Sequence, residues 1–243
     1  MRVKITLSYD GSSFNGFQIQ HNAKNIKTVA GVITKTLKDL NINTVLVGSG
    51  RTDSKVHATA QVLHCEIPEF WHDLDKLKKE LNRTIEPSIY IKKIEQADEN
   101  FHARFSAKKR VYRYFLYSGE YQPFLSDYAL HVDNINTNKL DAALKGFVGT
   151  HNFKNFKKLG SVTSSDTREV FKAGAYVYKN TTVIYFVGSS FLRSQVRMMC
   201  SFALEVMQDN LTYKQLKEQL DGKIKHHCGV IPSSGLYLSK IYY

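Results

Sequence analysis

Apolar and polar residues alternate along the first strand-length of the chain. Every second residue from Val3 to Tyr9 is apolar or aromatic, and the residues between them are polar or charged. A period of two is that of a β-strand with one face in the core. The pattern therefore predicts a half-buried strand at the amino terminus, followed by a glycine-punctuated loop over residues 9–17.

A period of three to four residues begins after Thr28, which we expect to cap a helix. The apolar stripe of this helix comprises Val29, Val32, Ile33, Thr36, Leu37 and Leu40. A second helix is predicted around Leu74, Leu77 and Leu81, and strands are predicted at 44–47, 61–66 and 88–94. The first hundred residues are thus predicted to run β-α-β-β-α-β.

The rest of the chain repeats this theme. Strands are predicted at 111–117, 170–178, 182–187 and 236–242, and helices at 137–148, at 191–208 and in a short segment ending near Gly222. We therefore predict an α+β fold of two similar halves, residues 1–100 and 101–243, with the boundary near 98–105. Each half would be a mainly antiparallel sheet with helices on one face, and the two sheets would join around a central basic cleft.

Composition and charge narrow the class of protein. Hydrophobic residues make up 42% and charged residues 23%, as in ordinary globular proteins. Lys and Arg number 34 against 22 Asp and Glu, and the net charge of +12 favours a polyanionic partner, most often nucleic acid. A membrane surface is the competing partner, but we find no basic amphipathic helix with bulky aromatic residues opposite and no apolar run near the roughly 20 residues of a membrane span.

The cysteines and the amino terminus indicate the compartment. Cys65, Cys200 and Cys228 are far apart and odd in number, which argues against a disulfide framework. The first ten residues lack the continuous apolar core of a signal peptide. We therefore expect a reducing, cytoplasmic environment.

The strongest candidate chemistry lies in residues 48–58, Gly-Ser-Gly-Arg-Thr-Asp-Ser-Lys-Val-His-Ala. This is a glycine-rich turn between two apolar segments, and functional side chains favour such loops. Asp53 is a candidate nucleophile or general base, and Arg51 is close enough to hold its carboxylate ionised and to bind a phosphate. The alternative interpretation is a turn with a capping aspartate and a surface arginine.

Two further stretches could contact nucleic acid. Residues 101–117 contain five Lys or Arg and no acidic residue, and strand geometry puts Tyr112 and Tyr114 on one face with Arg113 on the other. Aromatic faces stack on extruded bases while cations hold phosphates, although core tyrosines would give the same pattern. In residues 191–201, Arg193 and Arg197 are four apart and are predicted to share a helix face, which could equally be a solvated edge.

Metal and nucleotide sites are not predicted. His57, His64 and Cys65, and likewise His226, His227 and Cys228, lack a second ligand pair at a suitable spacing. The segment 48–51 lacks the Lys-Ser/Thr and the spacing of a phosphate-binding Walker loop. We therefore predict no metal and no cofactor.

Five motifs, in order along essentially the whole chain, resemble the TruA family of tRNA pseudouridine synthases. They are Tyr-Asp-Gly-Ser-x-Phe-x-Gly-Phe-Gln at 9–18, Gly-Arg-Thr-Asp with Val-His-Ala at 50–58, Phe-His-Ala-Arg-Phe-Ser-Ala and its following strand at 101–114, Phe-x-x-x-x-Val-Arg at 191–197, and Pro-x-x-Gly-Leu-x-Leu at 232–238. The chain departs from the family where Ser54-Lys55 replace Ala-Gly and where Gln195 replaces Met.

The resemblance implies a function for four residues. Asp53 would be the nucleophile or general base, Tyr112 the tyrosine that packs against the target base, Arg197 the arginine that pairs with the aspartate, and Arg51 a further group that holds aspartate and phosphate. The family isomerises uridine to pseudouridine at tRNA positions 38, 39 and 40 of the anticodon stem-loop. It works as a homodimer that holds tRNA across both subunits and uses no cofactor.

Two other classes of protein are compatible with parts of this sequence. A non-catalytic RNA-binding protein would share the charge and the aromatic residues but would not require Asp53. A small-molecule hydrolase or lyase would keep Asp53 but would not need the basic strand. Within the synthase hypothesis, attack of the aspartate on C1′ and attack on C6 require the same group in the same place.

Overall fold

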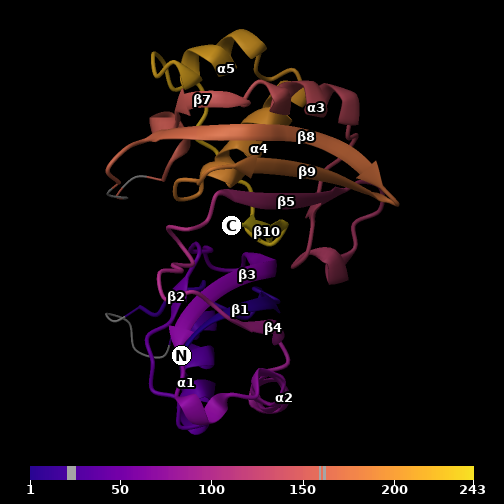
Figure 1. Cartoon of the computed structure of the whole chain (residues 1–243). Helices are drawn as coiled ribbons and strands as arrows, with labels where there is room; N and C mark the ends of the chain where they lie inside the picture. The colour runs from indigo at the N-terminus through magenta and orange to yellow at the C-terminus, as the bar shows by residue number, and fades with distance from the viewer. Residues whose placement is uncertain (21–25, 159, 161–162) are drawn as a thin grey trace. The chain divides into compact units, whose positions relative to one another are not determined.

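The computed structural model describes residues 1–20, 26–158, 160 and 163–243 (Figure 1). Its contacts divide the chain into two compact units, Met1–Lys108 with Leu238–Tyr243, and Lys109–Tyr237. Each unit contains a mainly antiparallel sheet with helices, which confirms the α+β class. The units differ from the predicted halves 1–100 and 101–243 in residues 101–108 and in the end of the last strand, both of which belong to the first unit.

The first unit is built on three central strands in the order β4-β1-β3, each antiparallel to its neighbour. The short β2 pairs with β3, and the end of β10 lies beside β3. Figure 1 shows both α-helices of this unit on the same side of its sheet. The elements are β1 (Arg2–Tyr9), α1 (Val29–Asp39), β2 (Val47–Gly48), β3 (His57–Glu66), η1 (Glu69–Trp71), α2 (Leu74–Thr84), β4 (Ile89–Gln96) and β10 (Leu236–Tyr242).

The sequence pattern accounts for most of this unit. The alternate residues of β1 from Val3 to Tyr9 are buried as predicted, and Thr28 caps α1 by accepting the Gly31 N–H at 3.2 Å. The strand predicted at 44–47 is shorter than expected, since backbone pairing begins only at Val47. At Thr44 the side chain, rather than the backbone, accepts the N–H of the neighbouring strand, at Glu66.

The second unit has the strand order β5-β9-β8-β7, all antiparallel, with β6 parallel to the end of β5. Helix α3 packs on β8 and on α4. The β8–β9 hairpin turns as predicted at Lys179-Asn180. The elements are β5 (Lys109–Tyr117), η2 (Pro123–Leu125), β6 (Leu130–His131), α3 (Thr137–Lys145), β7 (Gly149–Asn152), η3 (Phe153–Phe156), β8 (Thr167–Tyr178), β9 (Thr181–Gly188), α4 (Gln195–Met207) and α5 (Tyr213–Leu220), with β10 starting at Leu236.

Helix α4 begins four residues later than the apolar pattern predicts. Ser194 has a φ of 59°, in the left-handed region, which no α-helix continues through. The buried side chain of Gln195 accepts the Leu192 N–H at 2.7 Å and so stabilises this entry. Because Arg193 lies before the helix, the prediction that Arg193 and Arg197 share a helix face is wrong.

Candidate active site

The aspartate loop, residues 49–56, connects β2 to β3 in the first unit. Asp53 opens a tight turn in which its carbonyl accepts the Val56 N–H at 3.2 Å. Its side chain is half-buried, whereas Arg51 and Lys55 on either side are exposed. The loop therefore presents one half-buried carboxylate that is flanked along the chain by two exposed cations.

The backbone of residues 11–17 frames this loop at close range. Phe17 N–H donates to the Thr52 carbonyl at 3.1 Å, and Lys55 N–H donates to the Phe14 carbonyl at 3.1 Å. A Cβ on Gly11 would lie 2.1 Å from the Val56 carbonyl oxygen. Gly16, at a φ of +100°, would place a Cβ 2.9 Å from the Thr52 carbonyl oxygen. The two glycines of the opening motif are thus required for the frame of the aspartate loop.

Buried polar side chains fix the same loop from the sheet. Gln61 is fully buried, accepts Ser49 Oγ–H at 2.8 Å and donates to the Gly50 carbonyl at 2.9 Å. The hydroxyls of Tyr9 and Thr52 are hydrogen-bonded at 2.7 Å. The residues on both sides of Arg51 are therefore anchored to the sheet, Gly50 to β3 and Thr52 to β1, which pre-organises the loop.

Ser54-Lys55, the departure from the family motif, has a definite backbone consequence. Lys55 has a φ of 63°, in the left-handed region that favours glycine. The turn therefore keeps the shape that a glycine would take, with a lysine side chain exposed next to Asp53.

Tyr112 lies on β5 in the second unit, with 8% of its surface exposed. Its ring meets the edge of Phe191 with centroids 5.3 Å apart. Tyr114 is on the same strand face, as predicted, and its hydroxyl donates to the Pro232 carbonyl at 2.8 Å. Burial raises the pKa of Tyr114 well above its usual range, so this phenol remains a hydrogen-bond donor.

Arg197 lies in the first turn of α4 and is half-buried. Its Nε–H donates to the Ile231 carbonyl at 2.8 Å. The closing Pro-x-x-Gly-Leu motif thus begins where consecutive carbonyls, of Ile231 and Pro232, accept from an arginine on α4 and a tyrosine on β5. The motif is more than a turn into the last strand, because its start also holds the side chains of Arg197 and Tyr114.

The four predicted site residues fall into two pairs. Arg51 and Asp53 lie together in the aspartate loop of the first unit, and Tyr112 and Arg197 lie in the second unit. Two features near these residues were not predicted: the bonds of Gln61 to the aspartate loop, and the contact between Ser201 and His227. Gln61 carried a signal, since it is a polar residue at an inward position of an apolar strand, whereas the contact between Ser201 and His227 joins residues 26 positions apart and leaves no local pattern.

The described ranges hold no group of three or more His, Cys, Asp or Glu residues that could bind a metal ion. Within the same ranges, no helix has the length and apolar character needed to cross a membrane. Cys65 and Cys200 are buried and Cys228 is exposed, all three as free thiols. Burial raises the pKa of Cys65 to about 12, which makes this thiol unreactive at neutral pH.

Comparisons with known proteins match the whole chain. A profile of the tRNA pseudouridine synthase family matches residues 5–106 and 143–243. These ranges include Arg51, Asp53 and Arg197, while Tyr112 lies between them. Proteins described as tRNA pseudouridine synthase A are 36% identical over all of both chains in Campylobacter jejuni, 35% identical over 99% of this chain and 98% of the relative in Helicobacter hepaticus, and 37% identical over 97% and 92% in Wolinella succinogenes.

Among solved structures, a Cbf5-Nop10-Gar1 complex is similar at a TM-score of 0.37 and 12% identity, over 82% of this chain and 44% of that one, a likeness too low to carry an argument. The relatives and the profile agree on one enzyme class, the isomerases that modify RNA. The chain belongs to the tRNA pseudouridine synthase family, and the resemblance found in its sequence is confirmed.

Proposed function

We propose that this tRNA pseudouridine synthase acts on uridines 38, 39 and 40 of the anticodon stem-loop and uses Asp53 as its nucleophile. The positions follow from the resemblance to the TruA family. The role of Asp53 is supported by the aspartate loop, in which a half-buried carboxylate stands between exposed Arg51 and Lys55 on a backbone locked by Gly11 and Gly16. That framing is the observation that carries the proposal.

The reaction needs a carboxylate and an accessible base, and no redox partner. The bond between N1 and C1′ breaks, the uracil rotates and a bond between C5 and C1′ forms. The proton on C5 leaves and N1 takes up a proton, so the product is an isomer of the substrate. Asp53 attacks either C1′ or C6, and both routes require its ionised form. The target uridine must first leave its stack, at an energetic cost that contacts from the protein offset.

The other three residues have distinct parts in the proposal. Arg51, exposed beside Asp53, binds the backbone phosphate next to the target uridine. Tyr112 supplies an aromatic face to the extruded base. Arg197, whose Nε is already bonded to Ile231, presents an oriented guanidinium that pairs with the aspartate.

We further propose that the enzyme works in the cytoplasm as a homodimer that holds tRNA across both subunits, without metal or cofactor. The net charge of +12 supports a polyanionic substrate larger than a single nucleotide. A dimer would double the basic surface offered to one tRNA. The measurement is the mass in solution, alone and with tRNA, and a monomer in both conditions would contradict this part.

The chemical proposal is tested with Asp53→Asn and tRNA carrying tritium at uridine C5. Tritium release reports loss of the C5 proton and hence formation of the carbon–carbon bond. We expect release to fall at least roughly a thousandfold because an amide is not a nucleophile, while tRNA affinity stays within a few-fold. Asp39→Asn, an exposed aspartate at the end of α1, is the matched control and should release tritium normally.

The same assay tests the position. Transcripts in which uridine 38, 39 or 40 is the single labelled site should each release tritium with the wild-type enzyme. Release from uridines elsewhere, with none from these three, would contradict the anticodon assignment while leaving the role of Asp53 intact. Substantial turnover by Asp53→Asn would overturn the role of Asp53.

A further inference from the structure

The segment from His227 to Ile231, which we call the strap, is tied at both ends to helix α4. At one end Ser201 Oγ lies 2.8 Å from His227 Nε2, and at the other Arg197 Nε–H donates to the Ile231 carbonyl at 2.8 Å. Arg197 and Ser201 are four residues apart, so they occupy the same face of α4. Two successive turns of one helix therefore hold the two ends of one short segment.

We propose that the Ser201–His227 contact is a positioning clamp that sets the orientation of the Arg197 guanidinium. The proposal rests on the proposed function of Arg197 in the reaction. Ser201 and His227 are positioning residues, because they act through the strap and not on the substrate. The clamp is a property of this chain's own side chains and lies outside the motifs that identify the family.

Gly229, in the middle of the strap, shows how closely the strap and the clamp pack. A Cβ at this position would lie 2.4 Å from His227 Nε2 and 2.8 Å from Ser201 Oγ. Any larger residue would therefore push on the two atoms that form the clamp. The strap reaches Ile231 along this path because residue 229 has no side chain.

His227 is itself held by groups that are not on α4. Its backbone N–H donates to Gln219 Oε1 and its carbonyl accepts from Gln219 Nε2, each at 2.9 Å, and Gln219 on α5 is fully buried. The His227 ring also meets the edge of Phe202 at 6.0 Å between centroids. The ring is thus held by groups other than Ser201. Its contact with Ser201 therefore sets the position of the strap relative to α4.

A serine bonded to a histidine is also the beginning of a nucleophilic dyad, but the surroundings argue against that use. Ser201 is 7% exposed, in a helix whose residues are almost all buried. Glu218 on α5 pairs with His226, the residue before His227, at 2.7 Å. A structural contact that serves Arg197 is the use that the burial supports.

The hydrogen bond between Arg197 Nε and the Ile231 carbonyl matters because an arginine side chain has many rotamers. Fixing Nε fixes the plane of the guanidinium, and a shift of the Ile231 carbonyl would turn that plane. Misplacement of a charged group by about 1 Å can cost on the order of a hundredfold in rate. The clamp is therefore expected to influence turnover more than tRNA binding.

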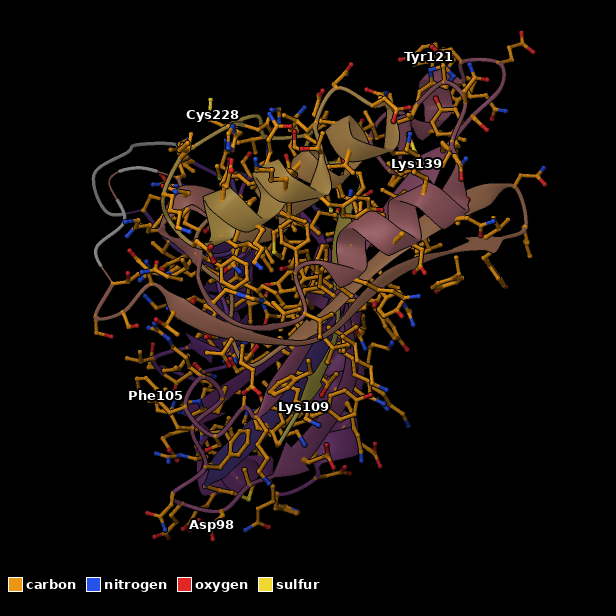
Figure 2. The ribbon with its side chains drawn as sticks, turned by 90° about the horizontal axis from the view of Figure 1, so that it is seen from above. Asp98, Phe105, Lys109, Tyr121, Lys139 and Cys228 are labelled. Carbon is orange, nitrogen blue, oxygen red and sulfur yellow. The ribbon has the colours of Figure 1, made fainter. Side chains whose placement is uncertain are left out.

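The test compares Ser201→Ala, His227→Ala and His227→Gln with a control, His226→Ala. His226 is the preceding residue, bonds to Glu218 and takes no part in the clamp. Figure 2 shows Cys228, the residue after His227, at the outer edge of its unit. The His227 ring, in contrast, contacts Ser201 on α4. Three quantities are measured: single-turnover tritium release, tRNA affinity, and solvent exchange of the Arg197 Nε–H by nuclear magnetic resonance, assigned with Arg197→Lys.

We expect Ser201→Ala and His227→Ala to lower the single-turnover rate by about tenfold, with tRNA affinity changed by less than about twofold. Exchange of the Arg197 Nε–H should become faster in both. The double variant should be no worse than either single variant, because both remove the same contact. His227→Gln, which keeps a polar group near the position of Nε2, should recover most of the rate, and His226→Ala should match the wild type.

Unchanged exchange at Arg197 in His227→Ala would overturn the clamp, and so would a parallel loss of rate, affinity and thermal stability without recovery in His227→Gln. Arg197→Ala separates the two proposals. Normal turnover in Arg197→Ala would refute the proposed function of Arg197, while the exchange measurement would still decide whether the clamp orients it.

Discussion

The aspartate loop and the strap both hold a charged side chain in place, but they do so with different atoms. In the aspartate loop the closest approaches are between backbones, with Gly11 against the Val56 carbonyl and Gly16 against the Thr52 carbonyl. At the strap the closest approach to Gly229 comes from side chains, those of His227 and Ser201. The loop that carries Asp53 is thus framed at closest range by backbone, whereas the strap whose Ile231 carbonyl holds Arg197 is packed at closest range by side chains.

This difference determines which of the two regions can be recognised as a motif in a sequence. A backbone-to-backbone approach constrains only the glycine, so its signature is a glycine at a fixed position whatever the neighbours are. A side-chain contact can be rebuilt from other pairs of residues, provided that the volume and polarity are kept. The first kind is readable as a motif, and the second requires the structure.

We expect the largest loss of stability from a methyl group added to Gly11, which packs against the backbone of the aspartate loop. In Gly11→Ala the Cβ meets the carbonyl of Val56 at the end of the aspartate loop, and a backbone cannot move aside cheaply. We expect the free energy of unfolding to fall by on the order of 3 kcal/mol, with loss of turnover. The measurement is denaturant unfolding together with tritium release.

Gly229→Ala is the matched variant in the strap, where the closest contacts are made by side chains. Here the added methyl meets the ends of two side chains, which can rotate, so the free energy of unfolding should fall by only about 1 kcal/mol. Turnover should nevertheless decrease because the Ser201–His227 contact is displaced. Equal destabilisation by the two alanines would show that the distinction between backbone and side-chain framing is not the one that matters.

A similar distinction, between local and long-range contacts, explains which features could be predicted from the sequence. The alternating pattern of β1 and the Thr28 cap of α1 are local, and both were predicted correctly. The start of α4 was not, because the left-handed Ser194 and the reach of Gln195 back to Leu192 depend on a conformation that an apolar stripe does not encode. Asp53 could be singled out from its glycine-rich setting. Gln61 stands out in the sequence only as a polar residue in an apolar strand, and its bonds to Ser49 and Gly50 become visible once β2 and β3 are paired.

An effect of comparable size concerns the aromatic contact in the second unit. Tyr112→Ala removes the proposed stacking face and should weaken the interaction with the extruded base by roughly 1–3 kcal/mol, measured as tRNA affinity and single-turnover rate. Tyr112→Phe keeps the ring and its edge contact with Phe191 and should retain most of that interaction. Normal binding with slow turnover in Tyr112→Phe would assign the phenol to proton transfer, and near-native activity in both variants would make Tyr112 a core residue.

A smaller effect is expected when alanine variants of Arg51 and Arg197 are compared for the salt dependence of tRNA binding. Arg51 is exposed, so Arg51→Ala should weaken tRNA binding and lower the slope of log affinity against log salt by about 0.7–0.9, the value for one phosphate contact. Arg197 is bonded to the protein backbone, so Arg197→Ala should reduce turnover with little change in that slope. The same change of slope in both variants would mean that Arg197 also binds phosphate.

The smallest effect is expected where this chain departs from the family pattern inside the aspartate loop. Lys55 adopts a left-handed φ of 63°, which costs a non-glycine residue on the order of 1 kcal/mol. Lys55→Gly removes that strain but adds entropy to the unfolded chain, so we expect a gain in the free energy of unfolding of no more than about 1 kcal/mol. Because the turn that positions Asp53 keeps its shape, the single-turnover rate should stay within about twofold, while the lost charge should slightly weaken tRNA binding at low salt.

Lys55→Ala is the control, since it removes the charge and keeps the strain. A large loss of rate in Lys55→Gly but not in Lys55→Ala would mean that the lysine restricts a backbone which glycine leaves too mobile, and that main-chain framing alone does not hold Asp53.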